Sequence, residues 1–475
     1  MIEIIFILYL SLIILVGIIS NKFVSSQLDF LLAGRRLGPW VTAFSERASA
    51  ESAWLLLGLP GAAYAFGYKE YWSVIGITLG IIGSWFLIAE RLRAETEKYQ
   101  SLTIPDYLQK RFNDTSGIIR NYSAIIISVF LTFYVSAQLH GAGKILNAIF
   151  EIEPLYGISL SAVVIILYTI MGGLLAVAWT DLVQGILMIG TLVILPIVGL
   201  IELSSFDAPL RDLIMSTDSQ KNSLIPSGLT GFATFSVIVG GLSWGLGYFG
   251  QPHLLIRYMA IRSVTEVKKA RVIATLWAIP GISGAFLIGI LAMTQEVGFG
   301  PDMYFDEKVR ESVMPELAKA LLPAWLAGLL ISGAVAAMMS TSDSQLLVST
   351  SAISEDLGVN VLKKRNKLLN SRVITVLLGI FAYLWAMYFQ WSGETVFSIV
   401  SFAWSGLGSS FGPALLLALW WKGVTRKGII VGLFTGSIST IIWGSSEYLQ
   451  SIVTERLISF VLAFIAIIII SKYKK

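Results

Sequence analysis

The chain has 475 residues, of which 55% are hydrophobic and only 13% are charged, whereas soluble domains carry about 25% charged residues. A net charge of +4 and two histidines do not indicate nucleic-acid binding or a histidine metal centre, and a sequence without cysteine has neither disulfides nor thiolate-bound metals. The composition therefore predicts one all-α membrane domain over residues 1–475, surrounded by a lipid bilayer and without a soluble enzyme domain.

Hydrophobic segments of about 20 residues, the length that crosses a bilayer, recur along the whole chain. The first, 3–20, has no basic n-region and no small-residue cleavage site, so we predict a retained span and not a signal peptide. With it, we expect about thirteen transmembrane helices, at 3–20, 41–66, 71–90, 120–149, 156–174, 178–201, 230–250, 272–294, 322–352, 372–390, 394–420, 427–444 and 452–471.

Basic residues are concentrated in alternate loops. The basic groups lie at 22–36, 91–120, 257–271, 363–372, 422–427 and 472–475, and the acidic loops lie at 151–153, 207–218 and 302–316. Because Lys and Arg mark cytoplasmic loops, we expect the N-terminus outside and the C-terminus in the cytoplasm, in the inner membrane of a prokaryote. This interpretation treats Arg257 as a loop residue.

Two of the predicted spans are interrupted. The second contains a polar run followed by Gly58 and Pro60 within Ala48–Pro60, and the seventh contains five glycines, Trp244 and Tyr248 within Val239–Pro252. A membrane protein accepts such breaks where the freed backbone lines a cavity, and matching breaks in two halves indicate the midplane site of an inverted-repeat transporter. The predicted halves are 41–201 and 230–420, with peripheral helices at 3–20, 427–444 and 452–471.

Charged residues stand beside the first break. A charge at the centre of a membrane helix costs about 2.5–3.5 kcal/mol on insertion scales, so each needs a partner or a wet cavity. Glu46 and Arg47 lie near the expected helix end, where they are either solvated or paired. Glu51 lies deeper, which favours a role beside the break.

A polar run occurs inside the predicted span 322–352. Ser340, Thr341, Asp343 and Ser344 offer hydroxyl and carboxylate oxygens, the ligands that hard cations prefer. Single membrane serines often bond only to the preceding turn, but several polar side chains in succession favour an ion site.

Two further polar positions are ambiguous. Asp181 is either a helix N-cap or a carboxylate that attracts a cation on its way to the cytoplasm. Tyr134 and Gln138 are four residues apart and share a helix face, so they are candidates to line a cavity. For Lys144 we expect that the side chain extends to the outer interface.

These motifs resemble the sodium:solute symporter family, and within it the proline-transporting members. The resemblance runs from about Gln27 to Lys427 and rests on five segments in family order: AGRRLGPWVTAFSERASAESAWLLLGLPGA (33–62), SLTIPDYLQKRF (101–112), GGLLAVAWTDLVQGILMI (172–189), SWGLGYFGQPHLLIRYMA (243–260) and ISGAVAAMMSTSDSQLLVSTSAISEDL (331–357). It implies a LeuT-type core of two inverted five-helix halves and sodium-driven uptake by alternating access.

The resemblance also implies site residues. The sodium ligands would be the carbonyls of Ala48, Glu51 and Ala337 and the hydroxyls of Ser340 and Thr341. Asp181 would serve sodium release, with Asp343 and Ser344 as candidates for a second ion. The substrate residues would be Ser52, Ala53, Tyr134, Trp244, Tyr248 and Pro252.

This chain departs from the proline symporters around the first break. Ala50 stands where they have an aspartate, Glu51 where they have methionine, and Ala53 where they have glycine. Glu46 and Arg47 replace small residues. The ion site and the pocket beside it are therefore expected to be rebuilt.

The expected function is sodium-coupled import of a small zwitterion, most readily proline, by a chain acting as a monomer and not as an enzyme. Betaine, another amino acid or a carboxylate fits similarly, and Glu51 leaves proton coupling open. A membrane enzyme is disfavoured because no acid–base or metal site converges in the sequence. A solute sensor would need a separate signalling partner, and paired broken helices favour alternating access over a channel.

Overall fold

The computed structural model describes residues 2–21, 27–215, 219–226, 228–300, 310–358 and 367–473, and most of them are helical. The α-helices are α1 (Ile2–Asn21), α2 (Gln27–Leu32), α3 (Pro39–Ala53), α4 (Leu59–Phe66), α5 (Tyr71–Ser84), α6 (Glu90–Lys98), α7 (Ile104–Arg111), α8 (Ile118–Phe150), α9 (Pro154–Leu203), α10 (Leu210–Ile214), α11 (Phe232–Leu242), α12 (Pro252–Ala260), α13 (Val264–Ala292), α14 (Val313–Leu321), α15 (Ala324–Ser351), α16 (Lys367–Ser392), α17 (Val396–Trp420), α18 (Arg426–Gly444), α19 (Glu447–Ile452) and α20 (Glu455–Lys472). The 3₁₀ and π segments are η1 (Ala33–Arg35), η2 (Trp54–Gly58), η3 (Gly67–Glu70), η4 (Trp85–Ala89), η5 (Ser219–Asn222), η6 (Ser243–Phe249), η7 (Arg310–Ser312) and η8 (Ala352–Asp356).

The prediction of an all-α membrane bundle is confirmed. Within the described ranges, nine helical stretches are long and apolar enough to span a membrane, and one of them, Pro39–Lys98, contains two predicted spans. Shorter apolar helices at Ile4–Ile13 and Pro154–Leu167, together with α20, coincide with the remaining predictions. Parts of the predicted loops, namely Lys22, 216–218, 302–309, 363–365 and 474–475, lie outside the described residues.

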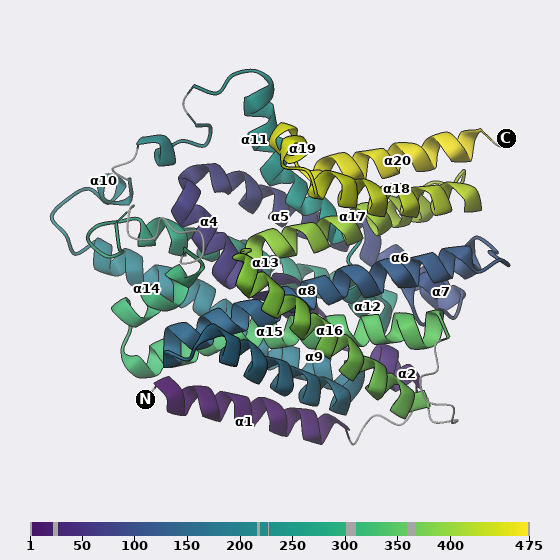
Figure 1. Cartoon of the computed structure of the whole chain (residues 1–475), viewed down its shortest axis with the longest axis horizontal. Helices are drawn as coiled ribbons and strands as arrows, with labels where there is room; N and C mark the ends of the chain where they lie inside the picture. The colour runs from purple at the N-terminus through teal and green to yellow at the C-terminus, as the bar shows by residue number, and fades with distance from the viewer. Residues whose placement is uncertain are drawn as a thin grey trace.

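The helices run roughly parallel to one long axis (Figure 1). α1 packs along α9 and α15 on one side of the bundle, and α18 and α20 lie together on the opposite side. α1 begins at one end of the bundle and α20 finishes at the other, which is compatible with termini on opposite sides of a membrane. The membrane orientation itself stays a prediction.

Both predicted helix breaks are present. α3 ends where Ser52 adopts φ 40° and ψ −169°, and the chain then continues through the π segment η2 into α4. A positive φ is strained for a residue with a side chain, and such strain gathers at functional sites. The second break runs from the end of α11 through the 3₁₀ segment η6 to α12, which starts at Pro252. Backbone groups are therefore freed at two points inside the bundle.

Small residues bring the second break against the scaffold. A Cβ atom placed on Gly80 of α5 would lie 2.3 Å from the Cα of Gly245, and one placed on Gly245 would lie 2.1 Å from the carbonyl oxygen of Gly76. Backbones approach this closely only where neither carries a side chain. The glycines that interrupt η6 thus also dock it on α5.

α9 continues over 50 residues and contains two predicted spans. Gly173, with φ 59° and ψ −175°, kinks the helix between them. Asp181 lies within the helical part of α9 that follows Gly173 and not at its first residues, so the interpretation of Asp181 as an N-cap is wrong.

Candidate functional site

The first break is held by side chains of α8. The Gln138 Oε1 atom accepts the Ala53 amide at 2.8 Å, and the Tyr134 hydroxyl lies 3.3 Å from the Ser52 Oγ atom, which also accepts the Trp54 amide at 3.3 Å. All five residues are buried. The structure therefore brings four predicted substrate residues, Ser52, Ala53, Tyr134 and Gln138, into one cluster around the freed backbone amides.

The second break adds an aromatic wall. The Trp244 ring stacks on Trp54 with centroids 5.4 Å apart and an interplanar angle of 16°. The Tyr248 ring meets Trp404 edge-on at 4.7 Å, and the Trp404 Nε1 atom donates to the Trp244 carbonyl at 3.1 Å. Tyr134 lies 6.4 Å from the same Trp404 ring. Trp404 on α17 thus connects the wall to the α8 cluster.

Each of the two predicted substrate rings already faces an arginine. The guanidinium carbon of Arg456 lies 4.3 Å from the Trp244 ring centroid, and that of Arg47 lies 5.5 Å from the Tyr248 centroid. Cation–π attraction is worth about 0.5–2 kcal/mol at these separations. A substrate ammonium would therefore compete with a guanidinium for either face.

Arg47 belongs to a fully buried charged cluster on α3. It binds both carboxylate oxygens of Glu46, and its Nη1 atom donates to the Glu51 Oε1 atom at 2.6 Å. Glu46 also accepts from the indole of Trp85 at 3.1 Å and the hydroxyl of Tyr258 at 3.2 Å. The alternative that Glu46 and Arg47 are solvated is wrong, because both side chains are 0% exposed.

Glu51 is the member of this cluster that has a carboxylate oxygen without a hydrogen-bond partner in the part of the chain that the structure describes. Its Oε2 atom is buried without a hydrogen-bond partner among the described residues, as is the Tyr248 hydroxyl. Buried polar atoms are normally satisfied, so this free carboxylate oxygen is a candidate contact for a water molecule, an ion or a substrate. Two carboxyl groups share one guanidinium at this position.

The predicted ion residues meet between α3, α9 and α15. The Thr341 hydroxyl donates to the Ser49 carbonyl at 3.2 Å, and the Ser340 hydroxyl donates to Asp181 Oδ1 at 2.6 Å. Ala48 and Ala337, whose carbonyls are predicted ligands, are also fully buried on the helices that meet here. The hydroxyl and carbonyl oxygens gathered here are hard ligands, which suit a sodium ion.

Arg257 enters this ion cluster from α12. Its Nη2 atom contacts Asp181 Oδ2 at 3.1 Å, Ser49 Oγ at 2.7 Å and Ser344 Oγ, and its Nε atom donates to Ser45 Oγ at 3.1 Å. The side chain is 0% exposed, so its assignment to a loop is wrong. A guanidinium therefore already neutralises the carboxylate that was predicted to receive a released ion.

Asp343 completes the cluster from α15. Its Oδ1 atom accepts the Ser344 hydroxyl at 3.2 Å, whereas its Oδ2 atom is buried and has no partner in the described part of the chain. Asp181, Asp343 and Ser344, the predicted second-ion residues, are therefore neighbours. They leave one carboxylate oxygen available to a cation.

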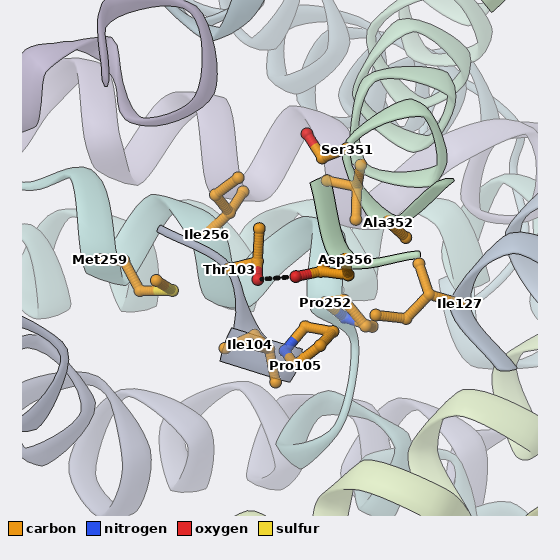
Figure 2. Close-up of a pocket in the computed structure, with 11 residues that line it drawn as sticks. Thr103, Ile104, Pro105, Ile127, Pro252, Ile256, Met259, Ser351, Ala352 and Asp356 are labelled. Carbon is orange, nitrogen blue, oxygen red and sulfur yellow. Dashed lines mark hydrogen bonds between the residues drawn. The ribbon is translucent and has the colours of Figure 1, made fainter. Parts of the chain in front are cut away.

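Pro252 lines another cavity of about 20 Å³, which has room for about one water molecule. Figure 2 shows Thr103 and Asp356 facing each other there, joined by a hydrogen bond of 2.8 Å. Arg120 donates to the same Asp356 oxygen at 2.8 Å. This contact fastens α7 and α8 to η8 on the predicted cytoplasmic side and lies apart from the aromatic wall.

On the opposite side of the bundle, a different ion pair links α8 to η7. Lys144 forms an ion pair with Glu311, whose carboxylate also accepts the amides of Val396 at 3.2 Å and Phe397 at 3.0 Å. The Lys144 side chain is 11% exposed, so the expectation that it extends to the interface is wrong.

Four residues with evident roles were not assigned from the sequence: Ser49, Arg257, Trp404 and Arg456. Ser49 stands in the polar run beside the first break, and Arg257 follows the second break within an apolar segment. These positions in the sequence are the signals from which a site role for Ser49 and Arg257 could have been predicted. Trp404 and Arg456 lie on helices whose composition does not distinguish them from lipid-facing spans.

Comparison with known proteins gives a consistent result. Residues 30–436 match the sodium:solute symporter family. The chain is 38% identical to the high-affinity proline transporter PutP of Bacillus subtilis, over 93% of this chain and 92% of the relative. It is 36% identical to the sodium/proline symporter of Escherichia coli, over 98% and 92% respectively.

Solved structures give the fold. A substrate-bound, outward-open Na⁺-coupled sialic acid symporter superposes with a TM-score of 0.79 at 20% identity, covering 100% of this chain and 98% of the other. MhsT in complex with L-phenylalanine superposes with a TM-score of 0.58 at 14% identity, covering 94% and 98%. Both likenesses extend over nearly the whole chain.

Proposed function

Because this chain belongs to the sodium:solute symporter family, we propose that it couples inward sodium flow to the import of proline by alternating access. Its fold is the LeuT-type inverted repeat, and the family consists of transporters and not of enzymes. The relatives at 35–38% identity are named as proline transporters or sodium/proline symporters. The observation that carries the proposal is the pair of broken helices with an oxygen-rich ion cluster on α15 beside them.

The substrate would lie between the α8 cluster and the aromatic wall. Its carboxylate would take the Ala53 and Trp54 amides, which Gln138 and Ser52 hold in this structure. Its positively charged nitrogen would meet the free Oε2 atom of Glu51. The proline ring would pack on Trp244.

Sodium would bind where the end of α3 meets α15. The Ala48, Glu51 and Ala337 carbonyls and the Ser340 and Thr341 hydroxyls are the proposed ligands. Asp181 with Asp343 and Ser344 would receive the ion on its way out. A sodium ion that joins α3 to α15 changes the relative stability of the two conformations, which is what coupling requires.

The chain is a multi-pass membrane protein. Its basic loops support an inner-membrane location with the N-terminus outside and the C-terminus in the cytoplasm. In that orientation the Lys144–Glu311 pair faces outward and the Thr103–Asp356 contact faces the cytoplasm. We place one complete pathway in each chain, so that a monomer suffices.

The test is uptake of labelled L-proline into proteoliposomes with an inward sodium gradient. We expect saturable uptake that stops when sodium is replaced by potassium or when the gradient is dissipated. Competition by unlabelled betaine, glycine and alanine then ranks other zwitterions. Uptake that does not change without sodium contradicts sodium coupling.

The ion ligands are tested with Ser340→Ala combined with Thr341→Ala. Loss of two hydroxyl ligands is expected to raise the sodium concentration for half-maximal uptake at least tenfold, with a smaller effect on proline affinity at saturating sodium. Ser332→Ala is the matched control, because Ser332 lies on the same helix and its hydroxyl donates only to Gly328 at 2.7 Å. Equal sodium dependence in the wild type, the double variant and the control would show that sodium does not bind to Ser340 and Thr341.

A further inference from the structure

An apolar cavity of about 90 Å³ lies between α1 and the core helices α8, α9 and α15. Every one of these helices contributes apolar side chains, and Ser161 is the only hydroxyl-bearing residue among the described residues that line the cavity. α1 lies along the edge of the bundle, where it packs on α9 and α15 (Figure 1). The cavity therefore lies at the junction between a peripheral helix and the core.

The cavity adjoins the lipid-facing surface of the bundle. Leu160 of α9 lines it and is 52% exposed, and Val163 and Leu167 continue the exposed apolar surface along the same helix. On α1, the exposed Ile7 follows Phe6, which lines the cavity. At a rise of 1.5 Å per residue, Leu160 lies roughly 9 Å along α9 from its first residue, which is within the hydrocarbon region of the bilayer.

Hydrocarbon is the filling that suits an apolar cavity in this position. A water molecule needs two to four polar partners, and apolar cavities stay dry. An empty space would deprive the lining side chains of dispersion contacts on one side. Acyl chains surround the bundle at this depth, so the end of one chain can enter the cavity and restore those contacts.

The inner wall of the cavity is shared with the proposed transport site. Met338 and Met339 line it from α15, and Met338 follows Ala337, a proposed sodium ligand. A Cβ atom placed on Gly141 of α8 would lie 3.5 Å from the Met338 methyl group and 3.1 Å from the Cβ atom of Ala53. Met338 therefore extends from the cavity to the point where α8 meets the first break. Methionine is flexible and fills irregular gaps, so its position depends on what the cavity holds.

We propose that this cavity is a binding site for one acyl chain of a phospholipid from the leaflet on the predicted outer side. The chain enters between α1 and the first half of α9, and its end packs against Met338 and Met339. Binding of the chain does not depend on the proposed transport function. A bound chain holds Met338 against α8, and it thereby supports the first break from the side that faces away from the substrate.

The experiment uses the purified full chain in nanodiscs of phosphatidylcholine that carries a photoactivatable diazirine at the end of one acyl chain. After illumination, mass spectrometry of peptide fragments locates the attached lipid. We expect label on Met338 or Met339, although both are buried, as well as on the exposed Ile7. Label on Ile7 is the internal standard, because this residue meets the surrounding lipid whether or not the cavity is filled.

Val164→Phe and Val163→Phe form a matched pair on neighbouring residues of α9. Val164 lines the cavity, so a phenyl ring there takes up the space of the chain, whereas Val163 is exposed to lipid and does not line it. We expect Val164→Phe to lower the ratio of methionine label to Ile7 label at least fivefold, and Val163→Phe to leave the ratio unchanged. Leu10→Ala enlarges the cavity from α1 and should raise the ratio, which tests the same site if Val164→Phe does not fold.

Three results overturn the inference. Label on Ile7 without label on Met338 or Met339 in the wild type shows that no chain enters the cavity. A ratio that changes in neither Val164→Phe nor Leu10→Ala shows that the label reaches the methionines by another route. An equal loss in Val163→Phe assigns the label to the outer surface of α9. Sodium-dependent proline uptake is measured separately in proteoliposomes, so its absence would contradict the proposed function and leave the acyl-chain site standing.

Discussion

The two fully buried arginines of the site differ in where their counter-charges lie. Arg47 is neutralised by Glu46 and Glu51 on its own helix, whereas Arg257 of α12 meets Asp181 of α9. Breaking a buried ion pair by removing one partner costs about 3–5 kcal/mol, mainly because the other charge is left alone. Removing the carboxylate partner of either arginine should therefore destabilise the fold, because the guanidinium is then buried without a counter-charge.

Arg257→Gln should lower the free energy of unfolding by several kcal/mol, since Asp181 and Asp343 then share one site without a guanidinium. The Arg257→Gln/Asp181→Asn double variant should recover much of that loss, although sodium-dependent uptake should stay impaired. Thermal unfolding of the wild type, the Arg257→Gln and Asp181→Asn single variants and the double variant in detergent measures the coupling. A double variant whose loss equals the sum of the single losses would mean that the two residues do not interact.

Glu51→Gln retains an acceptor for Arg47 and removes the charge at Oε2. We expect thermal stability close to wild type and a loss of proline affinity of roughly tenfold, equivalent to about 1.4 kcal/mol, because the substrate nitrogen loses an ionic partner. Equilibrium binding of labelled proline measures the change. Glu51→Asp retains the charge and serves as the comparison; equal affinity in all three proteins would place the nitrogen elsewhere.

At the level of elements, the position of η6 depends on backbone contact with α5. Gly80→Ala would place a methyl group 2.3 Å from Gly245, so the two segments must separate. Overpacking of this kind costs about 1–3 kcal/mol, and here it also displaces Trp244 and Tyr248. We expect reduced thermal stability together with weaker proline binding.

Gly240→Ala is the control for that substitution. It lies in α11 of the same broken span, and a Cβ atom there would meet nothing within 4 Å. Alanine should leave proline binding unchanged and stabilise the helix by about 0.5–1 kcal/mol. Impaired binding in this variant would show that glycine is needed for flexibility and not for close packing.

Sequence patterns predicted the elements better than their contacts. Hydropathy and glycine content depend on each segment alone, and they predicted the spans and both breaks. Arg257 was misplaced because its burial depends on Asp181, Ser49 and Ser344, which come from three segments far apart in the sequence. Lys144 was misplaced for the same reason, since Glu311 is 167 residues away.

At the level of the whole molecule, ion pairs join described loops on the predicted cytoplasmic side to the bundle. Asp114, in the turn before α8, accepts from Arg426 at the start of α18 at 2.8 Å. Burial acts to raise the pKa of Asp114, but hydrogen bonds from Ser116, the Ile119 amide and Arg426 outweigh it and hold the pKa below the ordinary value. Ionised Asp114 therefore strengthens a link between the turn and α18 that Arg426 also makes through Ser116.

A carboxylate with a depressed pKa stabilises the fold above its unfolded pKa, about 3.9 for aspartate, and loses that contribution as the pH falls through the folded value. Asp114→Asn should therefore be less stable than wild type at neutral pH, by about 1–3 kcal/mol. The difference should vanish in acid, below the pKa of Asp114. Thermal unfolding at a series of pH values measures it; a difference that is constant with pH would exclude ionisation as the cause.

The placement of the counter-charges also has a consequence for biosynthesis. α3 carries its two carboxylates and its guanidinium into the bilayer together, so most of its charge is neutralised before any other helix is present. α9 and α12 each enter with one unmatched charge, at a cost of about 2.5–3.5 kcal/mol on insertion scales. The Asp181–Arg257 ion pair can therefore form only after the ribosome has made α12. Assembly of the ion cluster therefore depends on the order of synthesis. A chain truncated before Arg257 would leave the carboxylate of Asp181 without its guanidinium partner.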